Sequence, residues 1–239
     1  ELILNNPAHL PFKDGKGGVD IGLRPIEESS WLEIDHLFSE EIALKEKLYS
    51  EKKDEVLVTS QNSQDTQKEA LDLVLEHLKN HHSDSYELKT DSIESKKNNS
   101  LYYYDDFQDP LELASLLIQE DLIIMKPKEN IFYLDSASLC APTRWSLKEK
   151  FQQSLSEIHR SVPGYKDKID SRVNTIFTNL PDQKIFERFN WSIFDSPELF
   201  QPAGNKSLVE IKNTQPDKLF IRVERQTIRR LDYSRAVLF

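Results

Sequence analysis

Cysteine is almost absent from this sequence: Cys140 is the only one among 239 residues. One thiol cannot form an internal disulfide or supply a cysteine cluster for a metal ion, so we expect a reducing compartment and a cytoplasmic protein. Cys140 lies close to Pro142 and has no identifiable histidine partner. This environment favours inert packing over a nucleophilic role.

Long apolar runs are also missing. No segment approaches the ~20 apolar residues that span a bilayer, and the first residues show no secretory signal pattern. The sequence therefore predicts a protein without a membrane as partner.

An excess of positive charge is missing as well, because 41 acidic residues face 31 basic ones and the net charge is -10. This balance argues against nucleic acid or an anionic membrane as the main partner. The Gly-x-Ser-x-Gly, dinucleotide-binding and His-Glu-x-x-His motifs do not occur. The usual hydrolase, dehydrogenase and metalloprotease functions therefore have no support.

What the sequence does contain is enough apolar residues, 38%, to form a core. Two amphipathic helices are predicted over 30–48 and 66–80, and the polar stretch 83–107 predicts a long loop. Residues 1–107 are therefore expected to form an irregular lead-in and a helical extension with a polar loop. The second helix ends with His77 and His81, a spacing that predicts either a shared metal ion or a solvated helix end.

Residues 108–239 are expected to form the main body. Apolar spacing predicts helices over 109–117, 142–160 and 166–180, and strands over 122–125, 130–139, 189–193, 219–231 and 236–239. This order of elements is typical of a PAS-like antiparallel sheet. We therefore predict an α+β fold with helices packed on one face of that sheet.

The helix expected over 142–160 carries the first candidate site residue. Ser146 and Glu149 form a capping-box pattern at its start, and Pro163-Gly164 cannot continue it. His159 follows Leu155 by four residues and extends the apolar stripe of the helix. A histidine at this place is either a hydrogen-bonded structural residue or a ligand for something buried there.

Arg225 is the second candidate. Strand alternation places it on the same face as Ile221 and Val223, where a guanidinium requires an anion. That anion is either an internal carboxylate, Glu120 or Asp121, or a carboxylate of a bound molecule. A neutral imidazole, an arginine and an apolar sheet face are together what a PAS-type haem pocket needs.

Several short runs occur in the order seen in one protein family. They are Gly22-Leu23-Arg24-Pro25-Ile26, Gln119-Glu120-Asp121-Leu122, Pro142 with Trp145, Glu149-Lys150, Ile158-His159 with Val162-Pro163, Asn190-Trp191-Ser192 and Arg222-Val223-Glu224-Arg225-Gln226-Thr227-Ile228-Arg229-Arg230-Leu231. From about Gly22 to Phe239 the chain resembles the alpha-subunit-like family of haem-dependent oxidative N-demethylases. That family usually has a glycine shortly after the Glu-Lys pair, where this chain has Phe151-Gln152.

The resemblance implies a PAS-type domain that binds haem b and is an oxidative monooxygenase. The family's best-understood member uses O2 to demethylate dimethylamine to methylamine and formaldehyde, with electrons from NADPH delivered by a flavin and iron–sulfur partner. Carried over to this chain, it implies His159 as the axial iron ligand. It further implies Arg225 and Arg230 as partners of the haem propionates and Glu120 as the residue that holds an ammonium substrate. The alternatives are a non-catalytic haem-binding sensor and a cofactor-free scaffold for a protein partner.

Overall fold

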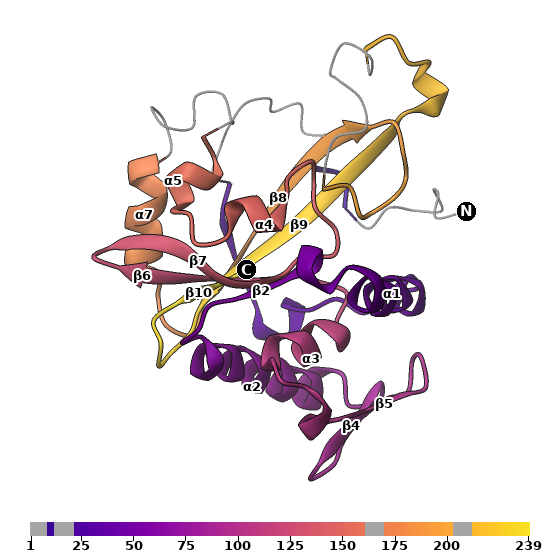
Figure 1. The fold of residues 1–239 in the computed structure, drawn as a ribbon, viewed down its shortest axis with the longest axis vertical. Coiled ribbons are helices and arrows are strands. Elements are labelled where there is room, and N and C mark those ends of the chain that lie inside the picture. The colour runs from indigo at the N-terminus through magenta and orange to yellow at the C-terminus, as the bar shows by residue number, and fades with distance from the viewer. Residues whose placement is uncertain (1–8, 12–21, 161–169, 203–211) are drawn as a thin grey trace.

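The computed structural model describes residues 9–11, 22–160, 170–202 and 212–239. Its centre is a seven-stranded sheet in the order β1-β8-β9-β10-β6-β7-β2, in which each pair of neighbours is antiparallel (Figure 1). The strands are β1 (Arg24–Ile26), β2 (Leu57–Thr59), β6 (Leu122–Lys128), β7 (Ile131–Ser138), β8 (Ile185–Phe194), β9 (Phe220–Arg230) and β10 (Val237–Leu238). The predicted α+β class is confirmed.

Two long antiparallel pairings organise this sheet. β6 and β7 are joined through Glu129 and Asn130, which both have positive φ, 53° and 66°, as the twisted two-residue turn of a hairpin requires. β8 and β9 pair along their whole lengths, from Ile185 opposite Arg229 to Phe194 opposite Phe220. The predicted strands of the body are therefore confirmed, and β8 is longer than the apolar alternation alone indicated.

Helices cover both faces of the sheet, so the prediction that they pack on one face was wrong. On one side lie α1 (Phe38–Val56), α2 (Gln64–His81) and α3 (Pro110–Leu116), and on the other lie α4 (Leu147–Lys150), α5 (Leu155–Ile158) and α7 (Asp170–Thr178) (Figure 1). The reason is that α1 and α2 each have an apolar stripe that must be buried. These stripes pack against the sheet face that α4, α5 and α7 leave uncovered.

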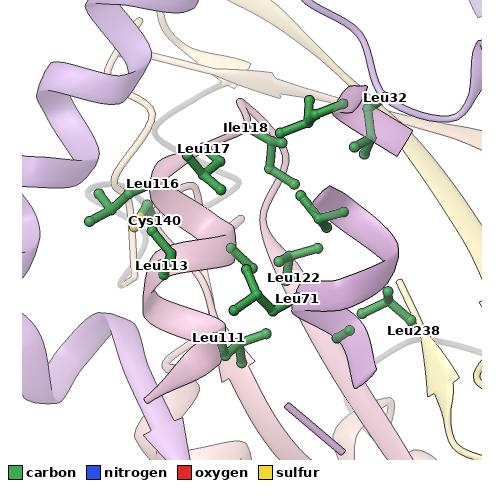
Figure 2. Close-up of a cluster of buried hydrophobic side chains, with 14 of the residues drawn as sticks. Leu32, Leu71, Leu111, Leu113, Leu116, Leu117, Ile118, Leu122, Cys140 and Leu238 are labelled. Carbon is green, nitrogen blue, oxygen red and sulfur yellow. The ribbon is translucent and has the colours of Figure 1, made fainter. Parts of the chain in front are cut away.

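The larger core lies on the α1–α3 side. Leu71 of α2 and Leu111 and Leu113 of α3 pack there against Leu122 of β6 and Leu238 of β10 (Figure 2). Burying one such side chain contributes about 1.5–3 kcal/mol. This cluster therefore fixes the N-terminal helices firmly to the sheet.

The N-terminal part also contributes to the sheet itself. β1 pairs with β8 and β2 pairs with β7, so the two outermost strands come from the first 60 residues.

The expected polar loop over 83–107 was wrong. This stretch forms a small antiparallel sheet of β3 (Tyr86–Leu88), β4 (Ser92–Ser95) and β5 (Ser100–Tyr103), in which Tyr86 and Ile93 are buried. The division at residue 107 stays a prediction.

In the part of the chain that the structure describes, three short 3-10 helices complete the ordered elements: η2 (Glu28–Ser30), η3 (Tyr104–Asp106) and η4 (Pro216–Lys218). Within the described ranges, no helix combines the length and apolar character that crossing a bilayer demands.

The single long helix expected over 142–160 was wrong. The chain forms only α4 and α5, and between them Gln152 has a φ of 60°. Gln152 N–H donates to Leu134 O, and Leu134 N–H donates to Gln153 O, so the linker bonds to β7 instead of continuing the helix. The capping box is formed by Ser154 and Glu157 rather than by Ser146 and Glu149. Pro163-Gly164 lies outside the described residues.

The left-handed backbone at Gln152 gives a test of this break. Replacing Gln152 by glycine should leave the free energy of unfolding unchanged or raise it slightly, because glycine adopts positive φ without a Cβ penalty. Replacing it by valine should lower that free energy by about 1–2 kcal/mol. Urea unfolding of both variants measures the difference. Equal stabilities would contradict the assigned backbone, since the side chain is exposed and makes little packing difference.

Candidate functional site

His159 lies at the C-cap of α5 and is half-buried. Its ring Nδ1 is 2.9 Å from Leu155 O, and a carbonyl oxygen only accepts hydrogen bonds. Nδ1 therefore carries the hydrogen and donates it, which leaves the lone pair on Nε2. A backbone carbonyl that fixes the tautomer and orientation in this way is the usual support of a metal-ligating histidine.

α5 places His159 on the side of the sheet that α4 and α7 cover. Leu155 and Ile158 of α5 belong to the same apolar cluster as Phe177 of α7, Phe186 of β8 and Ile228 of β9. Because Ile228 points to this side, alternation along β9 sends the other even-numbered residues, 222 to 230, to the same side. Odd-numbered residues of β9 point to the α1–α3 side.

Arg230 is therefore on the same side as His159. Its Nη2 donates to Phe177 O at 2.6 Å and to Thr178 O at 2.7 Å, and Nη1 is 3.7 Å from Asp182 Oδ1. Burial, with a smaller contribution from the nearby Arg235, lowers the pKa of Arg230. The guanidinium thus binds the last carbonyls of α7, a position that favours a cation.

Arg225 lies on the opposite side. Its Nε donates to Glu187 Oε2 at 2.8 Å and is 3.5 Å from Glu33 Oε1, and Nη1 donates to Trp31 O at 2.9 Å. Burial works against the charge on Glu187, but Arg225 and Arg24 outweigh it and hold the pKa of Glu187 below its usual value. Arg225 does have an internal partner, but this partner is Glu187 and not Glu120 or Asp121.

The two acids before β6 bind backbone amides. Asp121 accepts hydrogen bonds from Cys140 N and Ala141 N, each at 2.8 Å, and Glu120 Oε1 accepts one from Glu33 N at 2.8 Å. Oε2 of Glu120 is buried and has no hydrogen-bond partner in the part of the chain that the structure describes. Burial raises the pKa of Glu120 to about 7, against the opposing effects of the amide contacts, Lys45 and Arg225.

Glu120 is therefore on the α1–α3 side with Arg225, whereas His159 and Arg230 are on the other. The structure thus divides the four predicted site residues between the two sides of the sheet, two on each side. A porphyrin bound to His159 would have Arg230 on its own side of the sheet, with Arg225 and Glu120 behind the sheet.

A second half-buried carboxylate lies on the His159 side, and the sequence analysis missed it. Glu224 accepts hydrogen bonds from the Thr143 hydroxyl on Oε1 and, at 3.4 Å each, from the side-chain amides of Asn190 and Gln226 on Oε2. Burial raises the pKa of Glu224, although Arg222 Nε, 3.7 Å from Oε1, acts in the other direction. The sequence did contain a signal for it. Glu224 directly precedes Arg225 in the same run, and neighbouring residues of a strand point to opposite sides of the sheet.

A groove of about 470 Å³ lies along α7 on this same side. Leu23, Ile176, Leu180 and Phe186 make it mostly apolar, and Arg172 adds a cation. Its volume falls within the ~300–1,000 Å³ that small-molecule sites occupy. His159 is not one of its lining residues, so the groove does not enclose the imidazole.

Of the three histidines at the end of α2, His77 is buried, His82 is half-buried and His81 is exposed. The side chain of His77 is 0% exposed, and its ring centroid lies 4.8 Å from His81, 5.3 Å from His82 and 5.2 Å from Trp31. No group of three histidine, cysteine or acidic residues within the described ranges is arranged to hold a metal ion.

Cys140 is also buried, which raises its pKa to about 12 and makes its thiol unreactive.

One family matches almost the whole chain. The family described as haem-dependent oxidative N-demethylase, alpha subunit-like, matches residues 22–239. The matched range begins just before β1 and ends at the last residue, so it includes both pairs of candidate residues.

The His77 cluster predicts acid sensitivity. Burial first, and then repulsion by His82 and His81, lower the pKa of His77 from 6.5 to about 4, with Glu28 opposing. The unfolded chain then binds a proton that the folded chain does not. Stability from this residue is complete above pH 6.5 and is lost as pH falls toward 4, by up to about 3 kcal/mol.

Urea unfolding of wild type and His77→Phe at several pH values measures this loss. Phenylalanine keeps a ring against Trp31. Between pH 6.5 and 4, the slope of the unfolding free energy against pH should be smaller in the variant, by the equivalent of close to one bound proton. An unchanged slope would contradict a neutral, buried His77. The exposed His36, replaced by phenylalanine, is the matched control.

Proposed function

The chain belongs to the haem-dependent oxidative N-demethylase, alpha subunit-like family, and from this premise we propose that it binds haem b on the side of the sheet covered by α4, α5 and α7. There it would use O2 to demethylate a small secondary amine of the dimethylamine type, with release of formaldehyde. His159 is the proposed axial ligand.

The tautomer of His159 is the observation that carries the proposal. Leu155 O accepts the Nδ1 hydrogen at 2.9 Å, so Nε2 is the nitrogen that can donate electrons to iron. His159 is half-buried at the end of α5, next to Ile158, which packs against the apolar cluster on this side of the sheet. These are the properties that a neutral histidine ligand requires.

Arg230 is the proposed partner of a haem carboxylate on this side. Its guanidinium is 8% exposed and already binds two α7 carbonyls, so its position is fixed before any ligand arrives. Arg225 and Glu120, on the α1–α3 side, would act on such a group only indirectly. The ion pair between Arg225 and Glu187 would hold β8 against β9 behind the site.

When bound, haem would supply the O2 reactivity that oxidation of an N-methyl carbon requires. The protein's own residues would hold the group, exclude water through the apolar cluster of α5 and α7, and position the amine. Electrons would come from a separate flavin and iron–sulfur reductase subunit, since the sequence has no dinucleotide-binding motif and a single cysteine.

Haem titration tests the proposed ligand. The wild-type protein, titrated with haemin under reducing conditions, should develop a Soret band. His159→Ala should weaken haem affinity by at least tenfold and shift the band, because the iron loses its proposed donor. His36→Ala, at an exposed histidine, is the control and should behave as wild type.

Two results decide against the proposal. Wild-type protein without a Soret band would favour the cofactor-free scaffold, and an unchanged spectrum in His159→Ala would assign the iron to another residue. Turnover is tested separately. Haem-loaded protein given dimethylamine and an electron donor should release formaldehyde, and a loaded protein that releases none would favour the haem-binding sensor.

A further inference from the structure

The carboxylate of Glu224 has hydrogen-bonding capacity left over. An ionised carboxylate offers about four lone-pair positions. Oε1 takes the Thr143 hydroxyl. Among the residues that the structure describes, Oε2 is contacted only by the amides of Asn190 and Gln226, both at a long 3.4 Å. Arg222 does not saturate it, since its Nε is 3.7 Å away and its guanidinium nitrogens donate to the carbonyls of Ala141, Pro142 and Leu199.

Its surroundings would favour a second cation. The side chain of Glu224 is 20% exposed, so water reaches it but does not solvate it fully. Burial and, to a smaller extent, the nearby Asp121 raise its pKa, although Arg222 and the amides of Asn190 and Gln226 act in the other direction. The protein therefore compensates its negative charge incompletely. A bound ammonium group would relieve that deficit.

The position on β9 agrees with the proposed haem side. Glu224 is four residues from Ile228 and six from Arg230, on the same side of the sheet. At about 3.3 Å per residue, Glu224 lies some 13 Å along the strand from the apolar cluster around α5 and α7. The side-chain amide nitrogens of Asn190 and Gln226 both donate to Oε2 of Glu224.

We infer that Glu224, with the side-chain amides of Asn190 and Gln226, is the group that binds the ammonium of the amine substrate. The assignment rests on the proposed function and replaces Glu120 in this role. Glu120 lies behind the sheet and its Oε1 is held by Glu33 N. A protonated secondary amine has two N–H donors and no acceptor. It matches a carboxylate with acceptor positions still available.

Glu224 and Glu120 give a matched test, because both are half-buried, burial raises the pKa of both, and they lie on opposite sides of the sheet. Haem-loaded wild type, Glu224→Gln and Glu120→Gln are titrated calorimetrically with dimethylammonium chloride. Glu224→Gln should weaken binding by at least tenfold and Glu120→Gln by less than twofold. In wild type the affinity should fall as pH is lowered and Glu224 takes up a proton, and this dependence should disappear in Glu224→Gln.

A second variant, Asn190→Asp, is expected to gain affinity. Asn190 is exposed, so Asn190→Asp should fold, and it places another carboxylate beside Glu224. It should bind dimethylammonium several-fold more tightly, whereas tetramethylammonium, which has no N–H donor, should bind weakly to every variant. This variant keeps the test decisive if Glu224→Gln fails to fold, which thermal melting reports.

Three results overturn the inference while haem binding stands. They are a loaded wild type that binds no dimethylammonium, a Glu224→Gln affinity within twofold of wild type, and equal weakening by Glu224→Gln and Glu120→Gln. A wild type without a Soret band overturns the proposed function and the inference together. The Soret band therefore distinguishes the two failures.

Discussion

The antiparallel pairing of β8 with β9 is the constraint on which the rest of the molecule depends. It runs for ten residues without a shift in register, so each side chain of β9 is assigned to one side of the sheet. The basic and acidic residues of the run from Arg222 to Arg230 are thereby divided into two sets. A shift of one residue would exchange the two sets completely.

Each set is stabilised by a different kind of partner. On the α1–α3 side, Arg225 and Arg229 meet carboxylates, namely those of Glu187 and Glu28, and Arg229 lies 4.3 Å from the Trp31 ring. On the other side, Arg222 and Arg230 bind backbone carbonyls instead. Each of these two arginines also has a carboxylate 3.7 Å away, Glu224 for Arg222 and Asp182 for Arg230. The closer ion pairs of the run, at 2.8 and 2.9 Å, lie on the α1–α3 side.

The sequence predicted the elements better than their contacts. Helices at 66–80 and 109–117 and the strands of the body follow from apolar spacing, because each buries one face against the sheet. The helix at 142–160 did not form, since Gln152 and Gln153 bond to Leu134 of β7 and no local pattern indicates such a tertiary contact. The polar stretch 83–107 became a sheet because a few buried residues, such as Ile93, were enough to fix it.

The candidate site shows the same limit. His159 was identified from one helical spacing, although the helix that justified it is only one turn long. Pairing Arg225 with Glu120 or Asp121 was wrong because the partner, Glu187, is reached only through the register of β8 and β9. Glu224 was overlooked because the alternation that placed Arg225 was not extended to its neighbour.

The outer strands have a consequence for how the molecule assembles during synthesis. β1 pairs with β8 from residue 24 to residue 187, and β2 pairs with β7 from residue 57 to residue 138. The two edge strands, β1 and β2, therefore leave the ribosome long before β8 and β7, with which they pair. Until β8 and β7 have been synthesised, the backbone N–H and C=O groups of β1 and β2 lack their strand partners, and the sheet against which they pack is incomplete. Closure over such long loops is slow, and the nascent chain is open to association with other chains in that interval.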